Sequence, residues 1–215
     1  MAINDFTLNT ASICNLALSH LGMKPITDLT TDAAANNPSA LAINKHWGPC
    51  RNDLFREFQW SFANVIEPME MVLTVTQDDD YPEWASFYTY TENAATIWHV
   101  FDESTVKTKS ENQFEVVYNP TLNERLICCD LSTYNAAWCE YTYNVTDTLL
   151  WDTKFIMAFS YRLASAICME LTGDAEKALK LTQLYNAILH EAKRIDSREK
   201  KSKPTQSNPI VDARG

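Results

Sequence analysis

Apolar residues recur every three or four positions in four stretches of the chain, two before residue 66 and two after residue 148. This period predicts amphipathic helices. The first runs from about Thr10, a suitable N-cap, to Leu21, and Gly22 supplies its stop. The second opens at Asn37, which caps a helix with Pro38 in its first turn.

The second helical pattern continues to about Phe62 and contains an internal proline. Pro49, directly after Gly48, removes one backbone hydrogen bond and clashes with the preceding turn. The sequence therefore predicts a kink or a break at this dipeptide.

The two C-terminal stretches predict a helical hairpin. Asp152 is a good cap for the first of these helices, whose pattern ends at Gly173. Asp174 caps the last helix, which continues through Ile195. Because one glycine joins them, the two helices should lie antiparallel.

Residues 67–147 are rich in Thr, Val, Tyr, Phe and Trp and contain no glycine. Short alternating runs separated by turn-like groups are typical of antiparallel strands. The clearest runs are Phe114 to Tyr118, Arg125 to Cys129 and Trp138 to Val145. The turns between them must depend on Asn, Asp and Pro.

Together these patterns predict an α+β chain: a four-helix bundle formed by the N- and C-terminal helix pairs, with a β-rich antiparallel insertion and an extended C-terminal arm. The flanking helices should pack together, since amphipathic helices cannot bury their apolar stripes alone. The expected boundaries are 1–66 and 148–199 for the bundle domain, 67–147 for the insertion and 200–215 for the arm.

Composition excludes several classes of protein. Hydrophobic residues make up 46% of the chain and charged residues 21%, as in ordinary globular proteins. No apolar run approaches the 18 residues of a membrane span, and the first residues lack the features of a signal peptide. We therefore expect no membrane partner, and six cysteines that are reduced structural thiols.

The charge is unevenly distributed. Six basic residues against two acidic ones give residues 193–203 a balance of +4, which leaves −14 for the rest of a chain whose total is −10. This acidic part of the chain, outside residues 193–203, repels phosphate and disfavours tight nucleic-acid binding. The basic segment could contact nucleic acid or an acidic protein surface, or it could be the solvated end of the last helix.

Motifs for catalysis or cofactors are missing from the sequence. Four glycines, all isolated, exclude phosphate-binding loops. His46 and Cys50 share a helical spacing but are only two ligands, and the run Asp78 to Asp80 lacks the spacing of a calcium loop. We therefore expect no enzyme activity, no cofactor and no metal.

Two segments resemble the tail tubular protein A, or head-to-tail adaptor, family of short-tailed (podovirus-like) bacteriophages. In the N-terminal segment the family's features fall on Leu16 to Gly22, Ile26 to Leu29 and Trp60 to Ala63. In the C-terminal segment, Phe155 to Ala192 is similar to the family's helical hairpin. The resemblance covers roughly residues 10–199 and is weakest in the β-rich middle.

The resemblance implies a structural subunit of the virion neck, assembled in the host cytoplasm. Such subunits form homo-oligomeric rings, usually of twelve copies, between the portal protein and the tail nozzle, or tail tubular B-type protein, and DNA passes through the channel without specific binding. We expect the basic helix end and the arm to contact the portal; the residues of this predicted portal surface are Lys193, Arg194, Arg198, Lys200, Lys201, Lys203, Pro209, Ile210 and Val211.

Two alternatives remain open. A tail-associated cell-wall hydrolase would need two carboxylates across a groove; the β-rich region offers Glu83, Asp102, Glu103 and Glu140, without a spacing that singles out a pair. A helical host-factor-binding module would share only the helical pattern.

Overall fold

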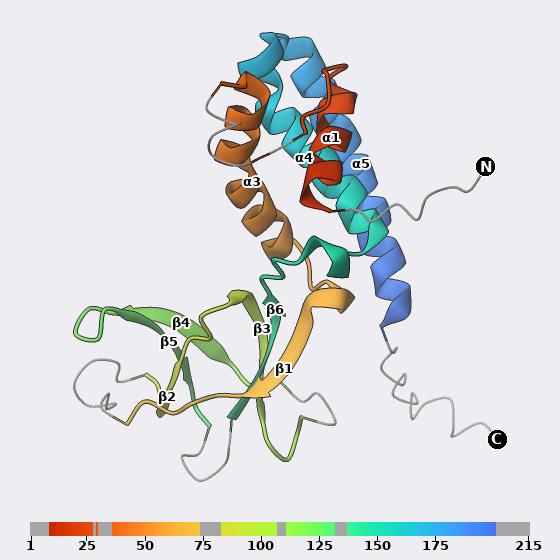
Figure 1. Cartoon of the computed structure of the whole chain (residues 1–215). Coiled ribbons are helices and arrows are strands. Elements are labelled where there is room, and N and C mark those ends of the chain that lie inside the picture. The colour runs from red at the N-terminus through yellow and green to blue at the C-terminus, as the bar shows by residue number, and fades with distance from the viewer. Residues whose placement is uncertain are drawn as a thin grey trace, which may run out of the picture.

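A group of helices and a group of strands stand end to end in the computed structural model of the chain (Figure 1). The structure describes residues 9–27, 29, 36–73, 83–106, 111–131 and 137–200. We call the helices the helical unit and the strands the β unit. The chain enters the β unit directly after the second helix of the described residues and returns from it to the third.

The helices begin and end largely where the pattern predicts. They are α1 (Thr10–His20), α3 (Pro38–Arg56), α4 (Thr153–Thr172) and α5 (Ala175–Glu199). Asn37, Asp152 and Asp174 accept hydrogen bonds from the first backbone N–H groups of their helices, which confirms all three caps. Gly173 has a φ of 66° and ends α4 in the left-handed conformation, as expected. The cap of α1 is Asn9, one residue before the predicted Thr10.

Of the kink or break predicted at Pro49, the break does not occur, because α3 runs as one helix from Pro38 to Arg56. It also stops six residues short of Phe62, because the chain turns into the 3-10 helix η1 (Ser61–Ala63). Trp60 is buried there, and its indole Nε1 donates to the carbonyl oxygen of Leu54 at 2.9 Å, which fixes the turn against the end of α3.

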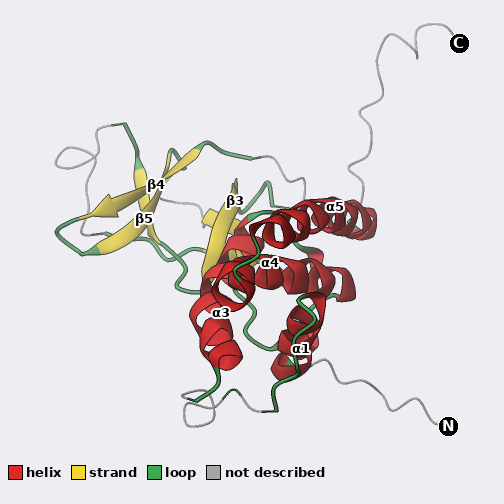
Figure 2. Ribbon diagram, turned by 90° about the horizontal axis from the view of Figure 1, so that it is seen from above, coloured by secondary structure: helices red, strands yellow, loops and turns green. Residues whose placement is uncertain are grey.

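α4 is the central helix. It packs against α1, α3 and α5, and Figure 2 shows it between them. Phe155, Phe159 and Leu163 are fully buried in the core that these helices share. By length and composition α4 is apolar enough to span a membrane, and half of its most apolar window is buried. Its central position accounts for that apolar character, since a helix contacted on several sides must be apolar around most of its circumference.

The β unit contains two antiparallel sheets of three strands each. One has the order β1-β6-β3, formed by β1 (Asn64–Pro68), β6 (Ala137–Tyr143) and β3 (Ala94–Asp102). The other has the order β2-β5-β4, formed by β2 (Ser86–Thr89), β5 (Glu124–Cys129) and β4 (Phe114–Asn119). The strands expected from the three clearest runs correspond to β4, β5 and β6 and are confirmed.

The β unit has hydrophobic clusters of its own. Val100, Ile127 and Tyr141 belong to one cluster, while Phe87 and Leu126 belong to a second. Adjacent residues on β5 alternate between them, because successive side chains on a strand point to opposite faces. The strands therefore pack around apolar clusters that are separate from the core of the helices.

The prediction of a four-helix bundle with a β-rich insertion is wrong. The chain is α+β, with four α-helices and two three-stranded antiparallel sheets in the residues that the structure describes. The helices are not equivalent members of a bundle, since α4 alone packs closely against the three others. The predicted bundle of N- and C-terminal helix pairs rests on amphipathic stripes. Such a stripe shows that a helix has a buried face, but not which neighbour covers it.

Candidate interaction surfaces

The C-terminal end of α5 folds back on the segment that follows α3. Lys193 Nζ lies 3.1 Å from Glu57 Oε2. Lys200 Nζ donates to the carbonyl oxygen of Gln59 and lies 4.5 Å from the centre of the Phe58 ring. Two of the basic residues predicted to contact a portal are therefore engaged within their own chain.

Asp196 stabilises the same contact as a hydrogen-bond acceptor. Its carboxylate accepts from the backbone N–H of Ser61 and from the Ser61 hydroxyl, both at 2.9 Å. The side chain is buried, and Lys200 Nζ lies 3.8 Å from Asp196 Oδ2. The end of α5 is thus joined to the 3-10 turn from which β1 starts.

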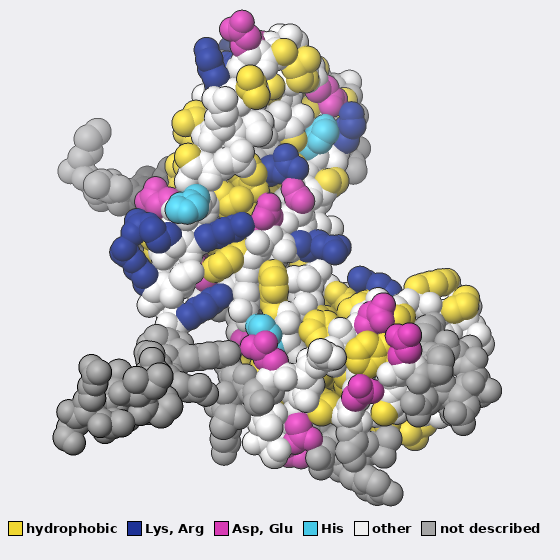
Figure 3. Space-filling view, turned by 180° about the vertical axis from the view of Figure 1, so that it is seen from behind, with side chains coloured by type: hydrophobic (Ala, Val, Ile, Leu, Met, Phe, Trp, Pro, Cys, Tyr) yellow, Lys and Arg dark blue, Asp and Glu magenta, His cyan; other side chains and the backbone are white. Residues whose placement is uncertain are grey.

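The remaining residues of the predicted portal surface divide into two groups. Arg194 and Arg198 are exposed on the outer side of α5. Figure 3 shows Lys and Arg side chains gathered on the half of the helical unit nearer to the strands. The other predicted residues lie outside the described part of the chain, and they are Lys201, Lys203, Pro209, Ile210 and Val211.

A small cavity lies where the helical unit meets the β unit. Its volume is about 180 Å³, and its lining residues are Asn52, Arg56, Ala94, Ala95, Arg125 and Asn144. They come from α3, from the start of β3, from β5 and from the residue after β6. The sequence alone does not predict this site, because no local pattern connects residues so far apart.

Polar groups converge on this junction cavity. The Asn144 side-chain amide donates to Asn52 Oδ1 at 3.2 Å, which bridges the two units. Asn144 Oδ1 is buried and has no hydrogen-bond partner among the described residues. The Arg125 guanidinium lies 3.8 Å from the centre of the Tyr90 ring. Beyond Arg125 a larger cavity of about 390 Å³ is lined by this ring and by Thr89, Glu92 and Glu124.

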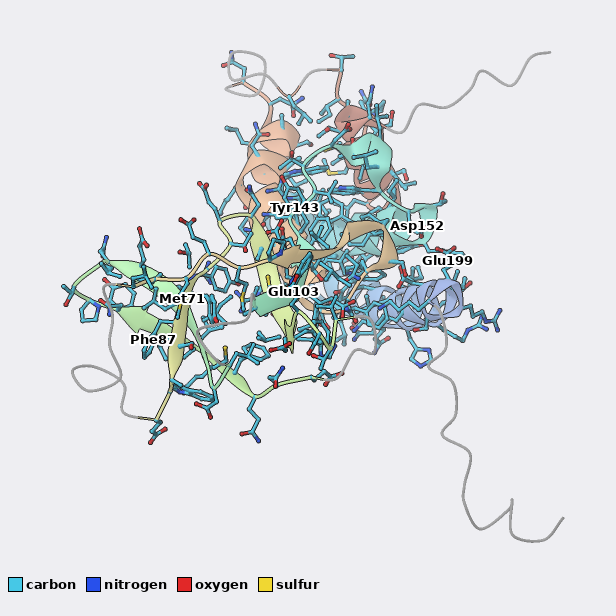
Figure 4. All side chains as sticks on the ribbon, turned by 90° about the horizontal axis from the view of Figure 1, so that it is seen from below. Met71, Phe87, Glu103, Tyr143, Asp152 and Glu199 are labelled. Carbon is cyan, nitrogen blue, oxygen red and sulfur yellow. The ribbon has the colours of Figure 1, made fainter. Side chains whose placement is uncertain are left out.

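Large apolar side chains are exposed on both units. On the helical side they include Leu149 and Leu150, in the 3-10 helix η2 (Thr148–Leu150), and Leu179 and Leu184 on α5. On the β side, Val116 and Tyr118 are exposed on β4. Figure 4 shows the end of α5, at Glu199, and the β2-β5-β4 sheet, at Phe87, on opposite sides of the molecule.

The candidate metal pair does not come together as a ligand set. His46 Nε2 lies 3.4 Å from Glu170 Oε2, whereas Cys50 is buried. Burial raises the pKa of the Cys50 thiol. Within the described ranges no group of three His, Cys, Asp or Glu side chains could hold a metal ion. The run Asp78 to Asp80 lies outside them.

All six cysteines are free and buried, in agreement with the expectation of structural thiols. Burial raises the pKa of Cys14 and of Cys128 to about 12, and that of Cys139 to about 11. Such thiols are poor nucleophiles, since the thiolate is the reactive form.

The four carboxylates considered for a hydrolase occupy different settings. Glu140 is buried and accepts from the Asn64 side chain at 2.8 Å. Asp102 accepts from the backbone N–H of Ser104 at 2.8 Å, in the turn after β3. Glu83 and Glu103 are exposed in turns. This arrangement favours none of them as a catalytic pair.

No protein-family model matches the chain, and no curated protein matches it.

Proposed function

We propose that the chain is a structural ring subunit of the head-to-tail adaptor type, connecting the portal to the tail nozzle of a short-tailed phage. The observation that carries the proposal is the exposure of large apolar side chains on separate faces. Leu150 on η2 is 64% exposed, Leu179 on α5 is 61% exposed and Tyr118 on β4 is 57% exposed.

Exposed apolar groups on two faces fit a subunit with several neighbours. A head-to-tail ring needs two different complementary surfaces on every subunit, and it closes when the rotation between neighbours divides a full turn. Leu179 belongs to α5 in the helical unit and Tyr118 to β4 in the β unit, so one subunit has separate apolar contact points for two others.

The charge of the chain agrees with a channel for DNA. A net charge of −10 keeps a polyanion from adhering to the subunit. Arg194 and Arg198 remain on the outside of α5, close to residue 200, where they are available for an acidic surface of the portal. The β2-β5-β4 sheet, on the opposite side of the molecule from the end of α5 at Glu199, would contact the nozzle (Figure 4).

Co-sedimentation of the purified chain with the portal ring of its phage tests this proposal. We expect a stable complex that the double variant Arg194→Gln/Arg198→Gln weakens and that Lys24→Gln, which removes one exposed charge elsewhere, leaves intact. A wild-type chain that never sediments with the portal would contradict the proposal. Degradation of purified cell wall by the chain would instead favour a hydrolase.

A further inference from the structure

The junction cavity holds two arginines that have no counter-ion among the described residues. Within the described ranges neither Arg56 nor Arg125 lies within 4.0 Å of a carboxylate oxygen, although both line the cavity. By contrast, Arg162 on α4 donates to Asp53 at 2.7 Å. Two unpaired guanidinium groups in a chain with a charge of −10 mark this cavity as a site for an anion.

The neighbouring amides can complete such a site. The orphaned Asn144 Oδ1 is a hydrogen-bond acceptor. A 180° turn of both the Asn144 and the Asn52 side-chain amides preserves the hydrogen bond between them. The orphaned position then becomes a covered N–H group, whose dipole favours an anion held by the two arginines.

Size and charge together identify the ligand. At about 180 Å³ the cavity is smaller than the roughly 300–1,000 Å³ of typical small-molecule sites, so it admits one small group. Arginine forks match the planar carboxylate well. A nucleic-acid phosphate would have to approach an acidic body, and that approach is repulsive.

The chain itself supplies suitable carboxylates. Glu83 and Glu103 are exposed and have no ion-pair partner among the described residues. Both lie in turns at the end of the β unit, where β2 begins and where β3 ends, while the cavity lies at the opposite end of the same strands. A subunit that carries a basic cavity on one surface and free carboxylates on another has the complementarity of a head-to-tail contact.

We propose that the junction cavity binds a carboxylate, and that in the assembled protein an acidic side chain of a second copy of this chain provides it. The second part rests on the proposed ring function, whereas the first part does not. Because the cavity is lined by both units, such a carboxylate would also fix the orientation of the helical unit relative to the β unit.

Two measurements test the two parts. In the first, line broadening of acetate and of inorganic phosphate is recorded by ligand-observed NMR at matched ionic strength, with the full chain kept below its association concentration. We expect acetate to bind the wild-type chain and Lys24→Gln equally, and to bind Arg56→Gln/Arg125→Gln about tenfold more weakly. Equal acetate binding by the double variant, or binding of phosphate without acetate, would overturn the carboxylate site.

In the second, self-association of the same three proteins is followed by light scattering against concentration. We expect the double variant to require about tenfold more protein to associate, with an unchanged far-UV circular dichroism spectrum that excludes misfolding. Unchanged association would overturn the second copy as the source of the carboxylate. A wild-type chain that binds acetate but stays monomeric at every concentration would contradict the ring itself and leave the carboxylate site standing.

Discussion

At the scale of single residues, Asp196 connects the last turn of α5 to the start of the β unit. It is 8% exposed, and its carboxylate satisfies both the backbone N–H and the hydroxyl of Ser61. A buried carboxylate that accepts from two donors contributes more to the free energy of unfolding than an exposed ion pair. Its removal would leave two donors without a hydrogen-bond partner in a place that is shielded from water.

Replacement of Asp196 by Ala should therefore lower the free energy of unfolding by about 2–3 kcal/mol. The matched control is Ser197→Ala: this exposed neighbour bonds only to a carbonyl of its own helix, and its loss should change stability by less than about 0.5 kcal/mol. Urea denaturation followed by circular dichroism measures both. Equal midpoints for the two variants would show that the Ser61 contact does not stabilise the fold.

The buried thiols make stability depend on pH in the alkaline range. The ordinary thiol pKa of 9.0 applies to the unfolded chain, while burial raises the pKa of Cys14 to about 12 in the fold. Between these pH values the folded state binds more protons than the unfolded state. The contribution of Cys14 to the free energy of unfolding is therefore fully present below pH 9 and falls as the pH rises towards 12.

We expect the wild-type urea midpoint to fall between pH 8 and pH 10, with Cys14 contributing about 1 kcal/mol to the loss. In Cys14→Ala this part of the pH dependence should disappear, although the variant is less stable at both pH values. A pH dependence identical to that of the wild type would rule out Cys14 as a contributor.

At the scale of elements, α3 contains a proline in the interior of the helix, where this residue is unfavourable. Pro49 is exposed in the interior of the helix, where it can donate no backbone hydrogen bond, whereas Pro38 occupies the first turn, where no donor is needed. Because the helix continues through Pro49, packing of its buried residues against α4 compensates for the lost hydrogen bond.

Pro49→Ala should therefore raise the free energy of unfolding by about 1–3 kcal/mol. Pro38→Ala, the matched control, should leave it unchanged or lower it slightly. Thermal unfolding of both variants provides the comparison. A destabilised Pro49→Ala would mean that the proline ring itself is part of the packing.

The helices were predictable from local signals, because the caps Asn37, Asp152 and Asp174 act within a few residues of the chain. The end of α3 was not predictable in the same way. The apolar period continues to Phe62, but Trp60 reaches the core from a 3-10 turn, which the period does not distinguish from a helix.

The division of six strands into two sheets, and the junction cavity, depend on contacts between residues far apart in the sequence. Arg56 and Arg125, which line the cavity together, are separated by most of the β unit. Neither has a local motif, and only the packing of α3 against β3 and β6 brings them together. One signal for the arrangement of the helices was present, since the apolar character of α4 indicated the central helix.

At the scale of the whole molecule, the chain leaves the helical unit and returns to it at neighbouring positions. Asn64 in β1 pairs with Thr142 in β6, and Ile66 pairs with Glu140. Residues 67–139 can therefore be replaced by an Asn-Gly turn that joins the two strands as a short hairpin.

The shortened chain should retain its helical circular dichroism and a cooperative urea transition, because the core of the helical unit consists mainly of residues from the four helices and the two connecting segments. Loss of cooperativity, with secondary structure retained, would show that the helical unit needs the β unit in order to pack.

We propose that this chain assembles into a closed ring. Electron microscopy of the purified full-length protein, with native mass spectrometry of the same sample, tests it most directly. We predict ring-shaped particles of one discrete mass that corresponds to about a dozen copies. Monomers at every concentration, or open filaments of variable length, would contradict it.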